Sequence, residues 1–245
     1  MSVLNRAGRG PIVLLCEHAS QHIPAAFEGL GLGETDLARH IAWDIGALGL
    51  SRHLSSMLDA PLAHANYSRL LLDLNRQPDA PDSIVAESEG TSVPGNIGLD
   101  AGQRELRRLR IYEPFHAEVD DLLDQRLALG ISTAVVSIHS FTPRYHGVSR
   151  PWHVGVIARA DRRLAEGLLR ALQAESGLCV GDNQPYGPQD GVYHSLGRHG
   201  EQRSLPGAMI EVRQDLLNDE ASQLRWAQTL RRCLESALRQ LRRAA

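Results

Sequence analysis

Short runs of consecutive apolar residues predict several buried strands in this chain. The first spans residues 12–16 (Ile-Val-Leu-Leu-Cys) and is followed directly by Glu17 and His18. An uninterrupted apolar run of this length is typical of a parallel strand that is covered on both faces. Further strands are predicted at 61–67, 69–76, 133–138, 154–158 and 208–212.

Helical periodicity fills most of the intervals between these strands. Apolar residues recur at helical spacing in 34–58, 103–129, 161–176 and 219–243. Thr35 or Asp36 can cap the first helix, and Gly130 and Gly177 can end the second and the third. Because strands alternate with helices, the pattern predicts an α/β fold whose largely parallel sheet is covered on both sides.

Two long segments, 77–96 and 181–206, lack regular periodicity. The first is rich in Pro, Ser, Gly and acidic residues, and the second contains His194 and Arg198. Segments this long are uncommon as plain connections between elements. We therefore expect 77–96 to be a mobile loop that borders a functional site.

Composition and charge narrow the class of protein. The 245 residues, 42% of them hydrophobic, suffice for one domain over residues 1–245. A net charge of −3 gives no general attraction to nucleic acid.

The three cysteines are far apart and form no CxxC pair, which argues against a disulfide framework and for a reducing compartment. No apolar run approaches the roughly 18 residues of a membrane span, so we expect a soluble, cytoplasmic protein. The sequence makes no prediction of the oligomeric state.

Two histidines each follow a predicted strand directly, His18 after 12–16 and His139 after 133–138. In a parallel sheet both imidazoles would emerge at the carboxyl edge, where ligands bind in open α/β sheets. Neutral imidazole is a good zinc ligand, and a catalytic zinc needs about three protein ligands. The alternative is that each histidine is simply hydrogen-bonded at the end of its strand.

Asp44 is the candidate for the third metal ligand. It lies on the apolar, core-facing stripe of the helix predicted at 34–58, where an unpaired carboxylate would be costly. It could instead pair with His40, one turn earlier, or with an arginine. Glu17 and His22 are rival ligands, although Glu17 should point away from His18 if the strand continues.

Glu211 lies inside the apolar strand predicted at 208–212. Burial should raise its pKa, as a general base and acid at a metal-activated water requires. A structural ion pair with an arginine is the alternative. Arg213 is not the expected partner within one strand.

Asn75 and Arg76 close the strand predicted at 69–76 and place an amide and a guanidinium at the sheet edge. Arginine is suited to bidentate binding of a carboxylate. Asp73 could orient this arginine or end the strand in solvent. Neither a phosphate-binding glycine motif nor a GxSxG nucleophile elbow is present in the sequence.

Six segments, in order and across nearly the entire chain, resemble the N-formylglutamate amidohydrolase family. They are CEHASQHIP (16–24), HIAWDIGA (40–47), SRLLLDLNR (68–76), SIHSFTP (137–143), GVYHSLGRHG (191–200) and AMIEVRQDL (208–216). The resemblance implies a three-layer α/β/α sandwich with a mostly parallel mixed sheet, phosphorylase/hydrolase-like and related to zinc carboxypeptidases and aspartoacylases.

The resemblance also implies roles for individual residues. They are metal binding by His18, Asp44 and His139, general base catalysis by Glu211, and binding of a substrate carboxylate by Asn75 and Arg76. One departure concerns the carboxypeptidase-type HxxE pattern, which would require a glutamate where Gln21 stands. Asp44 is the hypothesis that fills this gap.

The activity that these features predict is hydrolysis of the amide C–N bond of a small N-acylated acidic amino acid. One divalent metal ion, expected to be zinc, would activate water. Arg144, His194 or Arg198 would contact a second acidic group of the substrate. The alternatives are a metallopeptidase acting on small peptides or cell-wall fragments, and a non-catalytic binding protein on the same scaffold.

Overall fold

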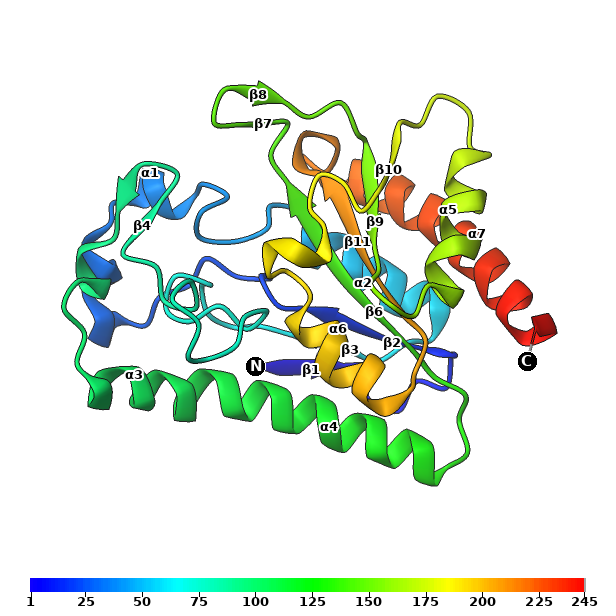
Figure 1. The fold of residues 1–245 in the computed structure, drawn as a ribbon, viewed down its shortest axis with the longest axis horizontal. Coiled ribbons are helices and arrows are strands. Elements are labelled where there is room, and N and C mark those ends of the chain that lie inside the picture. Colours follow the sequence, from blue (N-terminus) through cyan, green and yellow to red (C-terminus); the bar gives the residue numbers. More distant parts are fainter. Residues whose placement is uncertain (245) are drawn as a thin grey trace.

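A seven-stranded sheet organises residues 1–244, the part of the chain that the computed structural model describes (Figure 1). In spatial order its strands are β1 (Ser2–Leu4), β3 (Leu62–His64), β2 (Ile12–Cys16), β6 (Ala134–Phe141), β11 (Gly207–Arg213), β9 (Val154–Ile157) and β10 (Val180–Asp182). The β1–β3 and β11–β9 pairs are antiparallel and the other pairs are parallel. The predicted mixed, mostly parallel sheet is confirmed.

Helices cover both faces of this sheet (Figure 1). One face carries α2 (Ala47–Leu58), α5 (Arg163–Gln173) and α7 (Glu220–Ala244), and α7 packs against both of the others. The other face carries α4 (Glu113–Ala128) and α6 (His194–His199). A π-helical turn, Arg108–Tyr112, joins α4 to α3 (Ala101–Arg107). The three-layer α/β/α arrangement agrees with the prediction.

The long connecting segments contain short strands and helices. The segment predicted to be irregular at 77–96 contains the hairpin β4 (Glu87–Ser88) and β5 (Thr91–Ser92), and a second hairpin pairs β7 (Arg144–Tyr145) with β8 (Val148–Ser149). The segment 181–206 is less irregular than predicted, because it contains the end of β10 and all of α6. The 3-10 helices are Ala25–Gly31, Pro94–Asn96, Pro188–Asp190, Glu201–Arg203 and Gln214–Leu216.

The single helix predicted over 34–58 is wrong. The chain forms only the short α1 (Glu34–Leu37) and then α2, with turns between them. Gly46 precedes α2 in the left-handed conformation (φ 80°), which an unbroken helix cannot contain. A side chain at Gly46 would also collide with Leu217, whose carbonyl oxygen would lie 2.8 Å from the added Cβ. Asp44 therefore lies in a turn before α2 and not on a helical stripe.

The strand predicted over 69–76 is also wrong, although its leucines are buried. Side chains, not a neighbouring strand, satisfy its backbone carbonyl groups. Asn96 Nδ2 donates to the carbonyl of Leu70 (2.8 Å), and Arg107 Nη1 donates to that of Leu71 (3.0 Å). A buried loop is stable when its polar backbone groups are paired in this way. The same loop holds Asp73 and Asn75 beside the sheet edge.

None of the helices within residues 1–244 is both long and apolar enough to cross a membrane.

Candidate metal centre and active-site cavity

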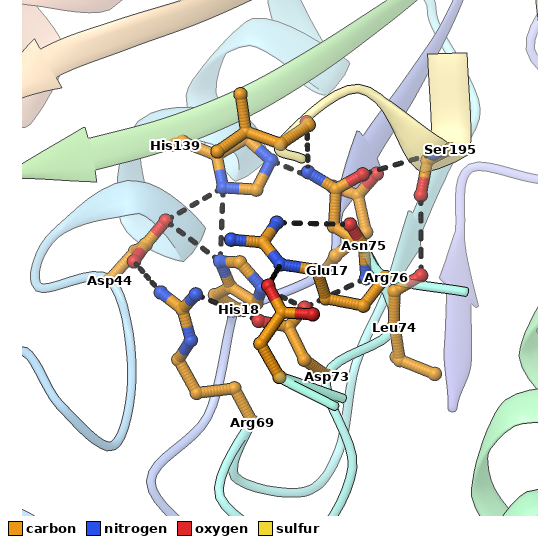
Figure 2. Close-up of polar contacts among 12 residues, drawn as sticks. Glu17, His18, Asp44, Arg69, Asp73, Leu74, Asn75, Arg76, His139 and Ser195 are labelled. Atoms are coloured by element: carbon orange, nitrogen blue, oxygen red, sulfur yellow. Dashed lines mark hydrogen bonds and ion pairs between the residues drawn. The ribbon is translucent and has the colours of Figure 1, made fainter. Parts of the chain in front are cut away.

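Two imidazoles and one carboxylate meet at the carboxyl edge of the sheet (Figure 2). His18 follows β2, and His139 lies two residues before the end of the adjacent strand β6. Their Nδ1 atoms are 3.2 Å apart. Asp44 Oδ2 lies 3.3 Å from Nδ1 of His18 and 2.8 Å from Nδ1 of His139. All three side chains are buried.

These separations match the donor set of a small divalent cation. Ligand atoms about 2.0 Å from a tetrahedral zinc ion are roughly 3.3 Å from one another. Nitrogen and carboxylate oxygen are both accepted zinc ligands. The three residues therefore fit a metal ion that keeps a coordination position for another molecule.

The backbone brings Asp44 to this position. Its N–H donates to the carbonyl oxygen of His18 (2.9 Å), and the N–H of Ser140 donates to its Oδ2 (3.3 Å). The other oxygen, Oδ1, is buried and has no hydrogen-bond partner within residues 1–244. His40 Nδ1 and Arg69 Nη1 both lie 3.6 Å from it, so the alternative pairings exist only as loose contacts.

Each imidazole contacts a carboxylate on the side that faces away from the other ring. His18 Nε2 donates to Asp73 Oδ1 (2.7 Å). His139 Nε2 lies 3.2 Å from Glu17 Oε2 and 2.9 Å from Ser137 Oγ, which itself donates to Glu17. Such partners fix the tautomer of a metal-binding histidine and direct its other nitrogen at the metal.

The carboxylates around the two imidazoles favour a positive charge at the centre of the cluster. Burial alone would lower the pKa of His139, yet its hydrogen bonds to Asp44 and Glu17 raise that pKa well above its ordinary value. Burial likewise opposes ionisation of Glu17, but the hydrogen bond with His139 lowers the pKa of Glu17 to about 2. Buried carboxylates of this kind are stabilised by a bound cation or by a protonated imidazole.

The two rival ligands lie outside this group. Glu17 contacts His139 from behind, through Nε2, and so cannot share a metal ion with the Nδ1 atoms. His22 is exposed, and its ring lies near that of Tyr67.

Glu211 stands next to the group on β11, with His139 as its direct neighbour on β6. Its carboxylate is buried, and Oε2 has no hydrogen-bond partner in the described chain. Burial chiefly, and the charge of Asp44 in addition, raise the pKa of Glu211 to about 7. A carboxylate with such a pKa can both accept and return a proton near neutral pH. A structural ion pair does not account for Glu211, since its buried Oε2 has no partner and no salt bridge within residues 1–244 includes it.

Asn75 and Arg76 lie on the wall of the same cavity. Asn75 is fixed at both ends of its amide, because Nδ2 donates to the carbonyl of Val192 (2.6 Å) and Oδ1 accepts from Ser195 N–H (3.0 Å). Arg76 donates through Nε to Asp82 (2.6 Å). Its Nη1 donates to the carbonyls of Asn75 and of Gly191, and Nη2 makes no hydrogen bond within 1–244.

The cavity has a volume of about 290 Å³. This lies at the low end of the volumes of small-molecule sites, so the cavity suits a single small substrate. His18, Asp44, His139, Asn75, Arg76 and Glu211 all line it.

The three residues predicted to meet a second acidic group are elsewhere. His194 and Arg198 line a neighbouring cavity of about 730 Å³, which shares Arg76 and Asp82 with the first. Arg144 is exposed on β7, where it donates to the carbonyl of Gly147 (2.8 Å).

Sequence reasoning missed the role of Asp73 and overlooked Arg69. Asp73 does not orient Arg76; it bonds His18 and Arg69, whose Nη2 lies 2.7 Å from its Oδ2. The four-residue spacing of Arg69 and Asp73 is compatible with an ion pair in a helical turn. The strand predicted over 69–76 does not bring residues four apart into contact, so it gives no sign of this pair. Tyr186, from the segment 181–206, also lines the cavity, and burial raises its pKa to about 12.

Comparison with known proteins identifies a matching family model and similar solved structures. The family model described as N-formylglutamate amidohydrolase matches residues 10–218. The crystal structure of gene product Atu2144 from Agrobacterium tumefaciens is 41% identical, with a TM-score of 0.95 over 97% of this chain and 94% of that one. N-formylglutamate amidohydrolase from Ralstonia eutropha JMP134 shares the fold at 20% identity, with a TM-score of 0.59 over 96% and 93% of the two chains. No curated protein matches the sequence.

Proposed function

The chain belongs to the N-formylglutamate amidohydrolase family, and from this we propose that it is a metal-dependent hydrolase of the amide bond in a small N-acylated amino acid. One observation carries the proposal: Nδ1 of His18, Nδ1 of His139 and Oδ2 of Asp44 converge beside the buried carboxylate of Glu211. A divalent metal ion held there, zinc being the expected one, supplies Lewis acidity for the scissile carbonyl and for water.

Glu211 is the proposed general base and acid. Hydrolysis adds water across the C–N bond, so that the acyl carbon gains a hydroxyl group and the nitrogen gains a proton. Glu211 takes the proton from water and returns it to the leaving nitrogen. Its unpartnered oxygen and its pKa of about 7 support this role.

Arg76 and Asn75 are the proposed binding site for the α-carboxylate of the substrate. Arg76 presents Nη2 while its remaining donors are fixed by Asp82 and Gly191. A guanidinium held in this way loses little conformational entropy when it binds a carboxylate. The family resemblance implies an acidic amino acid, so N-formylglutamate is the reference compound. The small volume of the cavity favours a single amino acid over a peptide.

A panel of N-formyl and N-acetyl derivatives of Asp, Glu and their amides, incubated with zinc-loaded protein, tests the proposal. We expect release of free amine, its loss on chelation, and its return on addition of zinc. Glu211→Gln should lower turnover by about 10²- to 10⁴-fold and keep one metal ion per chain. Absence of amine release from every compound would refute the amidohydrolase function. Full activity of Glu211→Gln would remove only Glu211 from it.

A further inference from the structure

Carboxylates outnumber guanidinium groups in the lining of the active-site cavity. Within residues 1–244 the acidic members are Asp44, Asp73, Asp82, Glu87, Glu89 and Glu211, and the arginines are Arg69 and Arg76. Asp44, Asp73 and Glu211 are deep and belong to the metal centre and its surroundings. The other three lie toward solvent: Asp82 holds Arg76, whereas Glu87 and Glu89 have no part in the proposed chemistry.

Both arginines of the cavity are already bonded to its carboxylates. Arg69 Nη2 lies 2.7 Å from Asp73 and Arg69 Nη1 3.6 Å from Asp44. Arg76 lies 2.6 Å from Asp82 through Nε. The Nη2 group of Arg76 is thus available for one substrate carboxylate. A second carboxylate would find no cation of its own among the lining residues.

The outer wall of the cavity is acidic. Glu87 on β4 and Glu89 in the turn after it both line the cavity. Glu87 is exposed and forms no salt bridge within the described chain, and Glu89 lies 3.9 Å from Arg39. Arg39 in turn also bonds Asp36, and it is not a lining residue.

Apolar side chains line the cavity together with these glutamates. Val85, Leu70 and Val192 are lining residues, as is Tyr186. An aliphatic stem can pack on such a surface while a charged group at its end remains near water and a carboxylate.

These observations favour a substrate side chain other than the glutamate that the family name implies. We infer that the amino acid released by this site carries a cationic side chain of the lysine or arginine type, because Glu87 and Glu89 would attract it and would repel a glutamate. The inference rests on the proposed amidohydrolase function. It changes the preferred amine half of the substrate and leaves the bond that is cut unchanged.

Two pairs of compounds of nearly equal shape isolate the effect of charge. They are Nα-formyl-arginine with Nα-formyl-citrulline, and Nα-formyl-glutamate with Nα-formyl-glutamine. The measurement is kcat/KM for formate release by zinc-loaded protein. We expect the arginine compound to exceed citrulline by about 3- to 10-fold, and glutamate to fall below glutamine by a similar factor, the range for one or two partly exposed charge pairs. Both ratios should shrink as salt is added.

The double variant Glu87→Gln/Glu89→Gln should bring both ratios close to one. Glu166→Gln/Glu220→Gln is the matched control, since it removes two exposed carboxylates that do not line the cavity; it should leave both ratios unchanged. A glutamate compound that is cleaved at least as well as glutamine, or ratios unaltered in the first variant, would overturn the inference.

Calorimetric titration of the four compounds into Glu211→Gln, loaded with zinc, separates this inference from the proposed function. Tighter binding of arginine than of citrulline, without turnover of any compound by the wild type, would refute hydrolysis and support the charge preference. Equal binding within both pairs, or no binding of any compound, would overturn the charge preference.

Discussion

The rings of His18 and His139 are held in place by the same kind of contact. Each ring presents Nδ1 to the shared centre and gives Nε2 to a carboxylate, Asp73 in one case and Glu17 in the other. The orientation of the rings therefore depends on residues that cannot themselves reach a metal ion.

Asp73→Asn and Glu17→Gln should each weaken zinc binding by about 10- to 100-fold, because removal of such a partner typically costs this much in metal affinity. Competition with a chelator of known affinity measures the loss. Asp82→Asn is the matched control, because Asp82 lines the same cavity and bonds Arg76 instead of an imidazole. Affinities equal to that of the wild type in both test variants would show that these carboxylates do not position the rings.

The site residues that could be predicted from sequence are those that lie in a buried apolar strand or directly after one. His18, His139 and Glu211 follow or lie in buried runs, so their convergence follows from strand order alone. Asp44 is predicted as a metal ligand because of its place in a helix that the structure does not contain. A hydrogen bond from its backbone N–H to the carbonyl oxygen of His18 holds it at the metal centre instead. That contact depends on a turn whose geometry no periodic pattern encodes.

At the scale of elements, Gly46 determines where α2 begins and hence where Asp44 lies. Gly46→Ala should destabilise the fold by about 2 kcal/mol or more, since the left-handed conformation costs roughly 1–2 kcal/mol in alanine and a collision with Leu217 is added. Gly98→Ala is the control: Gly98 also has a positive φ (70°), but its added Cβ would meet no atom within 4 Å. Urea denaturation compares the two, and equal losses would mean that Leu217 imposes no constraint.

The contact between α6 and the π-helical turn predicts a dependence of stability on pH. Tyr112 Oη and His194 Nε2 form a hydrogen bond (2.6 Å), and burial, aided by the charge of Arg198, lowers the pKa of His194 to about 4. The unfolded chain, in which this pKa is near 6.5, binds more protons between pH 6.5 and pH 4. Stability contributed by neutral His194 is therefore complete above pH 6.5 and is lost as the pH falls toward 4.

His194→Gln should thus lose less stability than the wild type between pH 7.5 and pH 5, by on the order of 1 kcal/mol once solvent screening of the partly exposed ring is included. Denaturation in the presence of chelator at the two pH values measures the difference. His22→Gln, which removes an exposed histidine, should behave as the wild type does. Identical pH dependence of His194→Gln and the wild type would contradict this assignment.

Two elements were predicted wrongly for a common reason. The segments 34–58 and 69–76 are apolar enough for a helix and a strand, but Gly46 interrupts the first, and Asn96 and Arg107 satisfy the backbone of the second. In both segments the pattern of apolar residues predicts correctly that the chain is buried. It cannot predict whether a backbone carbonyl group pairs with a neighbouring strand or with a distant side chain. That pairing decides whether a buried segment such as 69–76 is a strand or a loop.

For the molecule as a whole, the order of strands and helices sufficed to predict a mostly parallel sheet between two helical layers. The antiparallel β11–β9 pair could not be predicted, because periodicity does not give strand direction. One domain over 1–245 stays a prediction, and residue 245 lies outside the described part of the chain.

Metal binding should stabilise the entire fold, since segments from β2, β6 and the turn before α2 meet at the centre. Zinc at about 1,000 times its Kd should add about 4 kcal/mol. This corresponds to a rise in Tm of roughly 8–16 °C for a chain of this size. His18→Ala and His139→Ala should lose the response to zinc, whereas His22→Ala should keep it. A zinc-independent Tm of the wild type would contradict a metal that bridges these segments.

The central claim is that one metal ion sits between His18, His139 and Asp44. Anomalous diffraction at the zinc edge, from crystals of the zinc-loaded protein, tests it most directly. We expect one peak about 2.0–2.2 Å from Nδ1 of each histidine and from Oδ2 of Asp44. A peak coordinated by other residues, or none between these three atoms, would contradict the account.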